Sequence, residues 1–316
     1  MRILARTAQI RLLAVIAVLV VGLAGTARSQ PPAQTIDVTA RYKKGVDRVK
    51  TGDLTLPKDA ASHDYVIVKG LLGNKYPGYM SSSVKQLQRA GLNVKFAPIN
   101  TEASSEKNSK VISDMIKNAK RPIVFIGHSK GVVDTSDAIA ELAKKDPALV
   151  KRNVSAFVAI QGPYKGTPIA DVIMKTKIGR SLAGLVGKIL RTDLQAGDDL
   201  TTSRREAKIA ESPYPAHLVP TLSLATERLS SLSLLGPLQL FLKRKHGFAS
   251  DGLVPAHSSV IPGSAVAKDE IDHAQTPYGK SAGHRTLSLV SLALELRAEM
   301  LEQSIEFATA PPPSPN

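Results

Sequence analysis

A serine between two glycines is the part of this sequence best suited to do chemistry. Residues 127–131 read Gly-His-Ser-Lys-Gly. This pattern places a nucleophilic serine where a strand turns sharply into a helix. The turn strains the serine, and a side chain at either flanking position would clash, which accounts for the glycines. Ser129 would then project its Oγ at the N-terminus of the helix, and the backbone N–H of Lys130 is free there to hold a developing oxyanion.

The residues on either side of this pattern make it more specific. Residues 123–126 are a short apolar, β-rich run, which favours a buried parallel strand. Residues 132–145 have apolar positions near helical spacing and end in two lysines, which suits the last turn of a helix. The alternative is an ordinary connection from strand to helix with a helix-capping serine.

Further strands and helices alternate along the chain. We expect strands at 65–68, 92–97, 154–160 and 219–225, and helices at 81–90, 108–119 and 286–300. Residues 35–56 are less informative, and we expect a short strand or hairpin there. The alternation predicts an α/β fold with a doubly wound, mainly parallel sheet.

Two segments, 172–217 and 228–247, interrupt this alternation and are expected to form an inserted helical cap or lid. The first contains an apolar stripe at helical spacing, with basic residues elsewhere on the same segment. A mobile lid and a helix facing the core both remain open. The members of the stripe are Ile178, Leu182, Leu185, Val186, Ile189 and Leu190.

The chain of 316 residues begins with the pattern of a secretory signal. Residues 1–29 combine three early arginines, an apolar run of 13 residues and small residues at the end. The run is shorter than the roughly 20 residues that span a bilayer. We expect a signal peptide at 1–29, a leader at 30–64, the main domain at 65–308 and a disordered tail at 309–316. The expected location is the bacterial periplasm or the medium.

Charge and composition restrict the classes of partner. The formal charge is +15, and the four arginines in 1–29 reduce this to +11 after cleavage. Such a charge favours anionic surfaces, including anionic lipid. Nucleic acid is not expected, because tryptophan is absent, aromatic content is 4% and stacking platforms are therefore scarce. The absence of cysteine excludes disulfides, thiolate metal sites and a lipid-modified N-terminal cysteine.

Several motifs in order resemble the bacterial triacylglycerol lipases of the α/β-hydrolase superfamily. The resemblance spans about residues 65–300. It rests on Tyr-Val-Ile-Val-Lys-Gly-Leu at 65–71, the serine pattern at 127–131, Gly-Pro-Tyr-Lys-Gly-Thr-Pro-Ile-Ala-Asp at 162–171, Asp-Gly-Leu-Val-Pro at 251–255 and Asp-His at 272–273. These look like the strand before the family's oxyanion loop, its nucleophile elbow, the stretch after its next strand, its acid loop and its histidine.

Three positions depart from the pattern of the family. Lys69 stands where the family usually has histidine. Val132 replaces a frequent extra glycine after the elbow. Related calcium-binding lipases often have aspartate two residues beyond the histidine, and here that residue is Gln275, so a structural calcium ion is not expected.

The order of residues in the superfamily is nucleophile, acid, histidine. His63 precedes the serine, and His128 belongs to the elbow. His217 and His246 precede Asp251, which is the preferred acid. His257 lies only six residues after that acid. The preferred acid is Asp251, with Glu227 as the alternative, because Asp272 adjoins the histidine too closely. The preferred base is His273, with His284 as the alternative.

The resemblance implies a secreted serine hydrolase of carboxylic esters, a lipase or esterase acting through an acyl-enzyme. Ser129 would be the nucleophile, His273 the base and Asp251 its partner, with the N–H groups of Leu71 and Lys130 holding the oxyanion. No cofactor is needed. An amidase, a thioesterase, a polyester depolymerase and a non-catalytic binding protein on the same fold are the alternatives.

Overall fold

Parallel strands form the central sheet of this protein. The computed structural model describes residues 36–175, 194–228 and 235–309. Within these residues one sheet of six strands has the order β2-β1-β3-β4-β5-β6, and every neighbouring pair is parallel. The predicted doubly wound parallel sheet is therefore confirmed. The bounds are β1 (Asp64–Val68), β2 (Asn93–Phe96), β3 (Ile123–His128), β4 (Val154–Ile160), β5 (Thr221–Thr226) and β6 (Ala265–Asp269).

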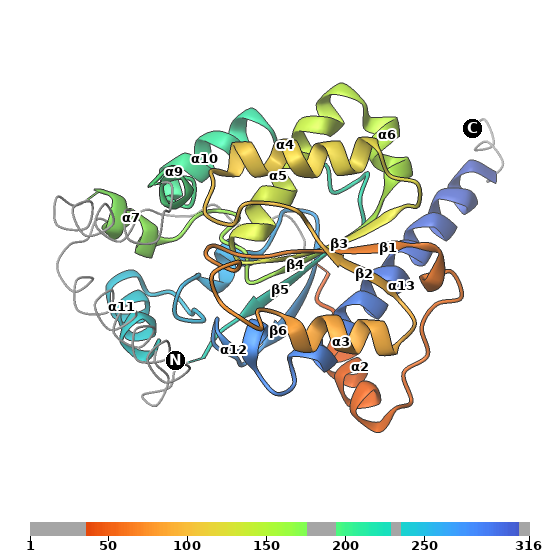
Figure 1. The fold of residues 1–316 in the computed structure, drawn as a ribbon, viewed down its shortest axis with the longest axis horizontal. Helices are drawn as coiled ribbons and strands as arrows, with labels where there is room; N and C mark the ends of the chain where they lie inside the picture. Colours follow the sequence, from red (N-terminus) through yellow and green to blue (C-terminus); the bar gives the residue numbers. More distant parts are fainter. Residues whose placement is uncertain (1–35, 176–193, 229–234, 310–316) are drawn as a thin grey trace, which may run out of the picture.

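Helices cover both faces of the sheet (Figure 1). One face carries α2 (Thr39–Thr51), α3 (Ser81–Arg89), the short α12 (Gln275–Tyr278) and the long α13 (Ala282–Thr309). The opposite face carries α4 (Ser105–Lys117), α5 (Lys130–Lys145), α6 (Pro147–Asn153) and α10 (Thr202–Glu211). Such a three-layer arrangement requires strands that are apolar on both sides.

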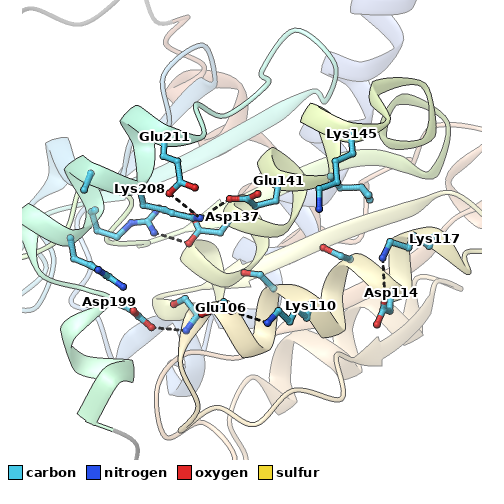
Figure 2. A pocket seen from close by; sticks show the side chains of 17 residues that line it. Glu106, Lys110, Asp114, Lys117, Asp137, Glu141, Lys145, Asp199, Lys208 and Glu211 are labelled. Carbon is cyan, nitrogen blue, oxygen red and sulfur yellow. Dashed lines mark hydrogen bonds and ion pairs between the residues drawn. The ribbon is translucent and has the colours of Figure 1, made fainter.

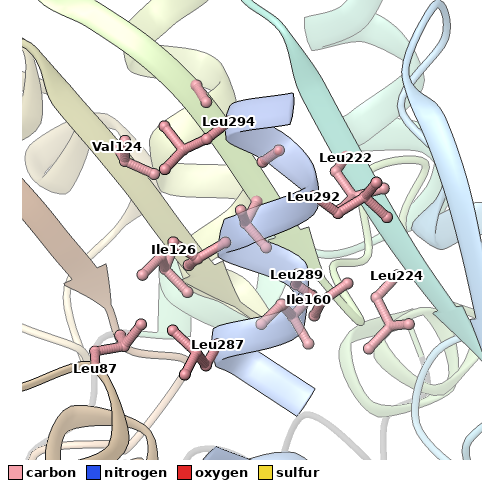
Figure 3. Close-up of a cluster of buried hydrophobic side chains, with 14 of the residues drawn as sticks. Leu87, Val124, Ile126, Ile160, Leu222, Leu224, Leu287, Leu289, Leu292 and Leu294 are labelled. Atoms are coloured by element: carbon pink, nitrogen blue, oxygen red, sulfur yellow. The ribbon is translucent and has the colours of Figure 1, made fainter. Parts of the chain in front are cut away.

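Alternate residues of β1, β3 and β4 enter two different cores. In β1, Tyr65 and Ile67 belong to the core beneath α2, α3 and α13, whereas Val66 and Val68 belong to the core beneath α4, α5 and α6. Figure 3 shows the first of these cores, where leucines of α13 lie against side chains of β3, β4 and β5. Each fully buried leucine contributes about 1.5–3 kcal/mol of transfer free energy. This two-sided burial is why the strands read as continuous apolar runs.

The N-terminal part of the described chain corrects one prediction. Residues 39–51 form helix α2 rather than a strand or hairpin. Tyr42, Val46 and Val49 recur at helical spacing and pack in the core that contains α13, and this packing outweighs the β-branched residues just before the helix. Only the preceding residues pair with a strand, through a single parallel bridge between Asp37 and Val266.

Some elements were not predicted. Strand β6 and helices α6 and α12 are additions, and α13 extends well beyond the predicted 286–300. Helix α6 has a local signal that hydrophobic periodicity does not register. Pro147 occupies its first turn, and the side chain of Asp146 accepts a hydrogen bond of 2.8 Å from the N–H of Leu149.

The segments expected to form the cap are described only in part. They include the second half of α7 (Pro168–Lys175), together with α9 (Leu194–Asp198), α10 and α11 (Gly236–His246). Apolar side chains of α7 and α11 pack together with Leu253, close to the acid loop. The stripe at 178–190, the signal peptide at 1–29 and most of the tail at 309–316 lie outside the described residues. None of the described helices is both long and apolar enough to span a membrane.

The sheet topology creates one natural site. The chain leaves β1 through α3 on one face to reach β2, and it leaves β3 through α5 and α6 on the other face to reach β4. Connections therefore diverge from the carboxyl ends of β1 and β3, which lie side by side. In doubly wound sheets such a point is where ligands bind.

Candidate active site

Ser129 lies at this point, between the end of β3 and the start of α5. Its backbone angles are φ 55° and ψ −127°, a conformation that non-glycine residues seldom adopt. A Cβ on Gly131 would lie 2.2 Å from the carbonyl oxygen of Val68, and one on Gly127 would lie 3.0 Å from the carbonyl oxygen of Gly131. The close passage of β1 under the elbow therefore requires glycine at 131, and the tight turn into α5 favours glycine at 127, as the sequence pattern predicted.

The loop after β1 comes equally close to the serine. A Cβ on Gly70 would lie 2.8 Å from the Cβ of Ser129. The next N–H in this loop is that of Leu71, and the first N–H after the serine is that of Lys130. Within the described residues, neither of these two N–H groups has a hydrogen-bond partner. Two donors are thus available beside Ser129.

Asp251 and His273 meet through their side chains. Nδ1 of His273 lies 2.8 Å from Oδ2 of Asp251, and the backbone N–H of His273 donates to the carbonyl of Asp251 at 3.0 Å. The other carboxylate oxygen accepts from the N–H groups of Leu253 and Val254, at 3.0 and 2.8 Å. Asp251 is 0% exposed and His273 is 7% exposed. The carboxylate is thus fully bonded, which fixes the orientation of the imidazole.

The ring of His273 reaches the elbow through His128. The two imidazole centroids are 4.8 Å apart at an interplanar angle of 41°, and His128 directly precedes Ser129. In the described part of the chain, no hydrogen bond joins Ser129 Oγ to His273. Catalytic hydrogen bonds are often long before substrate binds, so this geometry is compatible with transfer of a proton between them.

The alternative acid and base lie elsewhere. Glu227 is exposed, and its backbone N–H donates to Asp269. His284 lies in the first turn of α13, where its Nδ1 is buried without a hydrogen-bond partner among the described residues. The carboxylate of Asp272 accepts from the N–H groups of Ala274 and Gln275 rather than turning toward His273.

The remaining histidines have other surroundings. His63 bonds to the carbonyl of Asp59 at 2.9 Å, and His217 is exposed. His246 and His257 both pack against the ring of Phe248.

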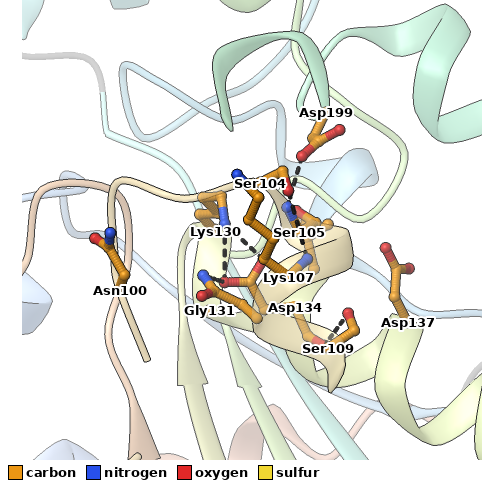
Figure 4. A network of polar contacts seen from close by, with 12 residues as sticks. Asn100, Ser104, Ser105, Lys107, Ser109, Lys130, Gly131, Asp134, Asp137 and Asp199 are labelled. Atoms are coloured by element: carbon orange, nitrogen blue, oxygen red, sulfur yellow. Dashed lines mark hydrogen bonds and ion pairs between the residues drawn. The ribbon is translucent and has the colours of Figure 1, made fainter. Parts of the chain in front are cut away.

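Lys130 is held by a buried ion pair one helical turn along α5 (Figure 4). Its Nζ donates to both carboxylate oxygens of Asp134, at 2.7 and 2.9 Å, and Asn108 of α4 donates to the same carboxylate at 2.7 Å. Burial raises the pKa of Asp134, and the ammonium of Lys130 opposes that rise. The contacts fasten the first turn of α5, which carries the N–H beside Ser129, to α4.

Two departures from the lipase pattern have local explanations. Nζ of Lys69 donates to Oδ1 of Asn74 at 3.3 Å and lies 4.3 Å from the ring centroid of Phe96, and burial lowers its pKa. Val132 packs onto Gly162, because a Cβ added to that glycine would lie 2.3 Å from the Cβ of Val132.

Gln275, at the position where related lipases often have aspartate, accepts hydrogen bonds from two groups. Its Oε1 accepts from Nη1 of Arg228 at 2.5 Å and from the N–H of Asp272 at 3.0 Å. A cationic guanidinium therefore occupies this amide oxygen. The described residues also contain no group of three histidine, cysteine or acidic side chains suited to a metal ion. At this position the side chains therefore form a contact between Gln275 and Arg228 rather than a set of metal ligands.

A polar groove of about 630 Å³ lies away from Ser129, between α4, α5 and α10 (Figure 2). Its acidic and basic side chains are mostly paired with one another, as Lys208 with Glu141 and Lys110 with Glu106. Arg205 makes a buried bidentate pair with Asp137, at 2.8 Å for each bond. None of Ser129, Asp251 and His273 lines this groove. We interpret its ion pairs as the contacts that hold α10 against α5.

Three residues at this edge were missed by the sequence analysis. Tyr79 and Gln161 hydrogen-bond to the two ring nitrogens of His128, and Thr226 bonds to Gln161. Gln161 and Thr226 lie at the ends of β4 and β5, a position that could have drawn attention to them. Tyr79 lies in a loop and has no comparable signal.

Solved structures share this fold. A metagenomic carboxyl esterase superposes with a TM-score of 0.64 at 20% identity, over 90% of this chain and 97% of that one. The mature form of the Bacillus licheniformis lipase BlEst2 superposes with a TM-score of 0.57 at 18% identity, over 76% of this chain and 96% of that one. No protein-family model and no curated protein matches the sequence. Together with the sheet order and the turn at Ser129, these likenesses establish that the chain has the α/β-hydrolase fold.

Proposed function

We propose that this protein hydrolyses carboxylic esters, with Ser129 as nucleophile, His273 as general base and acid, and Asp251 as the partner of His273. The observation that carries the proposal is the hydrogen bond of 2.8 Å between His273 and a fully buried Asp251, beside a strained serine. Nucleophile, base and orienting acid are the three roles that acyl transfer by serine requires. The esterase and lipase named above support the same class of reaction.

The reaction proceeds in two halves. Oγ of Ser129 attacks the ester carbonyl carbon while His273 Nε2 accepts its proton. That proton passes to the leaving alcohol as the carbon–oxygen bond breaks, which leaves an acyl-serine. Water then attacks the acyl carbon, His273 accepts a proton from it, and the proton returns to Ser129 as the acid leaves. Asp251 holds the proton of the imidazole on Nδ1 and stabilises the imidazolium formed in each half.

The N–H groups of Leu71 and Lys130 are the proposed oxyanion donors. Each is free of hydrogen bonds within the described residues and lies next to Ser129. Loss of one such donor typically costs about 3 kcal/mol of transition-state stabilisation. None of these steps uses a cofactor.

For the substrate and the location we propose a class of compound and a compartment. Esters and lipids are the substrate class, and anionic lipid is the surface favoured by the basic charge. Export to the periplasm or medium is proposed from the pattern of residues 1–29. N-terminal sequencing of the protein recovered from a bacterial culture medium or periplasm tests the export and the cleavage site.

A fluorophosphonate probe tests the reaction directly. We expect covalent labelling of Ser129 in the wild type and none in Ser129→Ala, with unchanged circular dichroism. Hydrolysis of p-nitrophenyl esters should disappear in the same variant. An amide and a thioester of the same acyl group, assayed in parallel, separate an esterase from an amidase or thioesterase. Hydrolysis by Ser129→Ala at the wild-type rate would refute the assignment, and a wild type that neither labels nor turns over would indicate a binding protein.

A further inference from the structure

His128 is a buried histidine with a hydrogen bond on each side of its ring. It is 1% exposed. Its Nδ1 lies 2.5 Å from the hydroxyl of Tyr79, and its Nε2 lies 3.1 Å from Oε1 of Gln161. Burial, followed by the charge of His273, lowers its pKa well below the ordinary value of 6.5. The ring therefore carries one proton at neutral pH.

The neighbours determine which nitrogen carries that proton. Gln161 lies 3.3 Å from the carbonyl oxygen of Asp272, which can only accept, so its amide nitrogen faces that carbonyl and its amide oxygen faces His128. Nε2 of His128 must then donate to Gln161, and Nδ1 must accept. It follows that Tyr79 donates its hydroxyl proton to Nδ1. Tyr79 thus donates to His128 and His128 donates to Gln161, so the hydrogen bonds run in the same direction.

The two ends of this chain of hydrogen bonds lie beside the two parts of the proposed site, which are the oxyanion loop and the Asp251–His273 pair. At one end the hydroxyl of Tyr79 accepts from the N–H of Gly70 at 2.9 Å, one residue before the proposed donor Leu71. At the other end Gln161 bonds to the carbonyl of Asp272, one residue before His273. These links join segments that are far apart in the sequence.

Gln161 makes a second connection at the same end. Its amide also donates to the hydroxyl of Thr226 at 2.6 Å, which in turn donates to Asp251 at 3.5 Å, the longest link. The chain of bonds therefore ends on the carboxylate that orients His273.

We propose that Tyr79 and His128 are positioning residues that set the oxyanion loop and the Asp251–His273 pair in one common geometry. The inference rests on the proposed function and extends it to two residues that take no part in the bond making and proton transfer of the proposed steps. His128 acts on His273 through the contact between their two rings. Tyr79 acts on the backbone at Gly70, where a Cβ would lie 2.7 Å from its hydroxyl oxygen.

This role predicts a specific kinetic effect. An oxyanion donor acts mainly in the transition state, so moving it lowers kcat while leaving KM almost unchanged. A displacement of this kind costs on the order of 10- to 100-fold in rate. A loss of folded protein would instead reduce the amount of active enzyme without changing the kinetics of the remainder.

The test is Tyr79→Phe in the full chain, with Tyr278→Phe as the matched control. Tyr278 is 46% exposed and packs edge-on against Tyr79 at 5.9 Å, and its hydroxyl has no hydrogen-bond partner among the described residues. For each protein, kcat and KM are measured with p-nitrophenyl butyrate, and the fraction of enzyme labelled by the fluorophosphonate is measured at long times. Nitrogen NMR of the His128 ring reports which nitrogen carries the proton.

We expect Tyr79→Phe to lower kcat roughly 10- to 100-fold with KM within about threefold and with complete final labelling. Tyr278→Phe should change neither constant by more than about twofold. The wild-type His128 should be protonated on Nε2, and Tyr79→Phe should shift the resonance of Nδ1.

Three results would overturn the inference: a kcat for Tyr79→Phe like that of the control, a loss explained wholly by reduced final labelling, or a proton on Nδ1 of the wild type. A wild type that is neither labelled at Ser129 nor active would overturn the proposed function instead.

Discussion

Lys130 and Asp134 form an ion pair inside the protein, with Nζ 2.7 Å from the nearer carboxylate oxygen and each side chain 1% exposed. The pair lies between α4 and the first turn of α5, one residue from Ser129. An ion pair removed from water so completely has to be kept intact, because a single remaining charge has no compensation.

Removal of one partner should therefore be costly. We expect Asp134→Asn to lower the free energy of unfolding by about 3–5 kcal/mol, because the ammonium of Lys130 is left buried and unpaired. Lys130→Met combined with Asp134→Asn should recover most of that loss, since the remaining amide can still accept from Asn108. Urea unfolding followed by circular dichroism measures both. A single variant as stable as the wild type would mean that solvent reaches the pair.

The choice of histidine leads to a second prediction. His273→Ala should lower kcat for dissolved esters by about four orders of magnitude, because the proton of Ser129 loses its acceptor. His284→Ala removes the same kind of ring from the first turn of α13, where its Nδ1 has no hydrogen-bond partner among the described residues, and its kcat should stay close to that of the wild type. Steady-state kinetics with p-nitrophenyl butyrate decides. The opposite ranking would move the base to His284 while leaving the class of enzyme unchanged.

Gly131, two residues after Ser129, is not expected to tolerate a side chain. The Cβ of Gly131→Ala would meet the carbonyl oxygens of Val68 and Lys69 at 2.2 and 2.8 Å, and both belong to backbone that cannot rotate away. We expect a loss of about 1–3 kcal/mol or more in unfolding free energy, together with loss of activity.

A second glycine in a helix provides the control. In Gly197→Ala the nearest atom is the flexible Sδ of Met174 at 3.1 Å, so the change should stay within about 1 kcal/mol. Thermal and urea unfolding of the two variants side by side tests the contrast, and equal stability would contradict the close packing of β1 beneath the elbow.

Buried His128 should make the protein less stable in mild acid. Its pKa in the native state is lowered well below 6.5, so the native ring stays neutral while the unfolded ring takes up a proton. The unfolded state then binds more protons, and the free energy of unfolding falls as pH drops below about 6.5.

The contribution of this ring can be isolated by substitution. Between about pH 6.5 and pH 5.5 His128 should account for about 1 kcal/mol of the loss. We expect His128→Gln to lose correspondingly less over that interval, as measured by urea unfolding at each pH. Other histidines with lowered pKa contribute in the same direction, so the test is the difference between the two slopes. Parallel slopes would show that the native and unfolded states protonate His128 equally, which would contradict its lowered pKa.

Local patterns in the sequence predicted the central layer and the turn at Ser129. The runs at 65–68, 123–126 and 154–160 are apolar without alternation, and only a strand buried on both faces suits such a run. The glycines at 127 and 131 mark a close approach of backbone, although not which strand comes close. Where the local signal was mixed, at 39–51, the prediction was wrong, because contact with α13 decided the outcome.

Contacts between residues at the ends of different strands could not be predicted from local patterns in the sequence. The sequence left Asp251 against Glu227 and His273 against His284, because side-chain direction in a loop depends on backbone angles that distant contacts impose, such as φ 103° at Gly252. Tyr79 and Gln161 meet His128, and Thr226 meets Gln161, only because the parallel register of β1, β3, β4 and β5 brings the ends of these strands to one edge. The sequence by itself determined which residue types were available for catalysis. Only tertiary structure decided which of them lie within hydrogen-bonding distance, since that distance is a property of the packed sheet and not of any single strand.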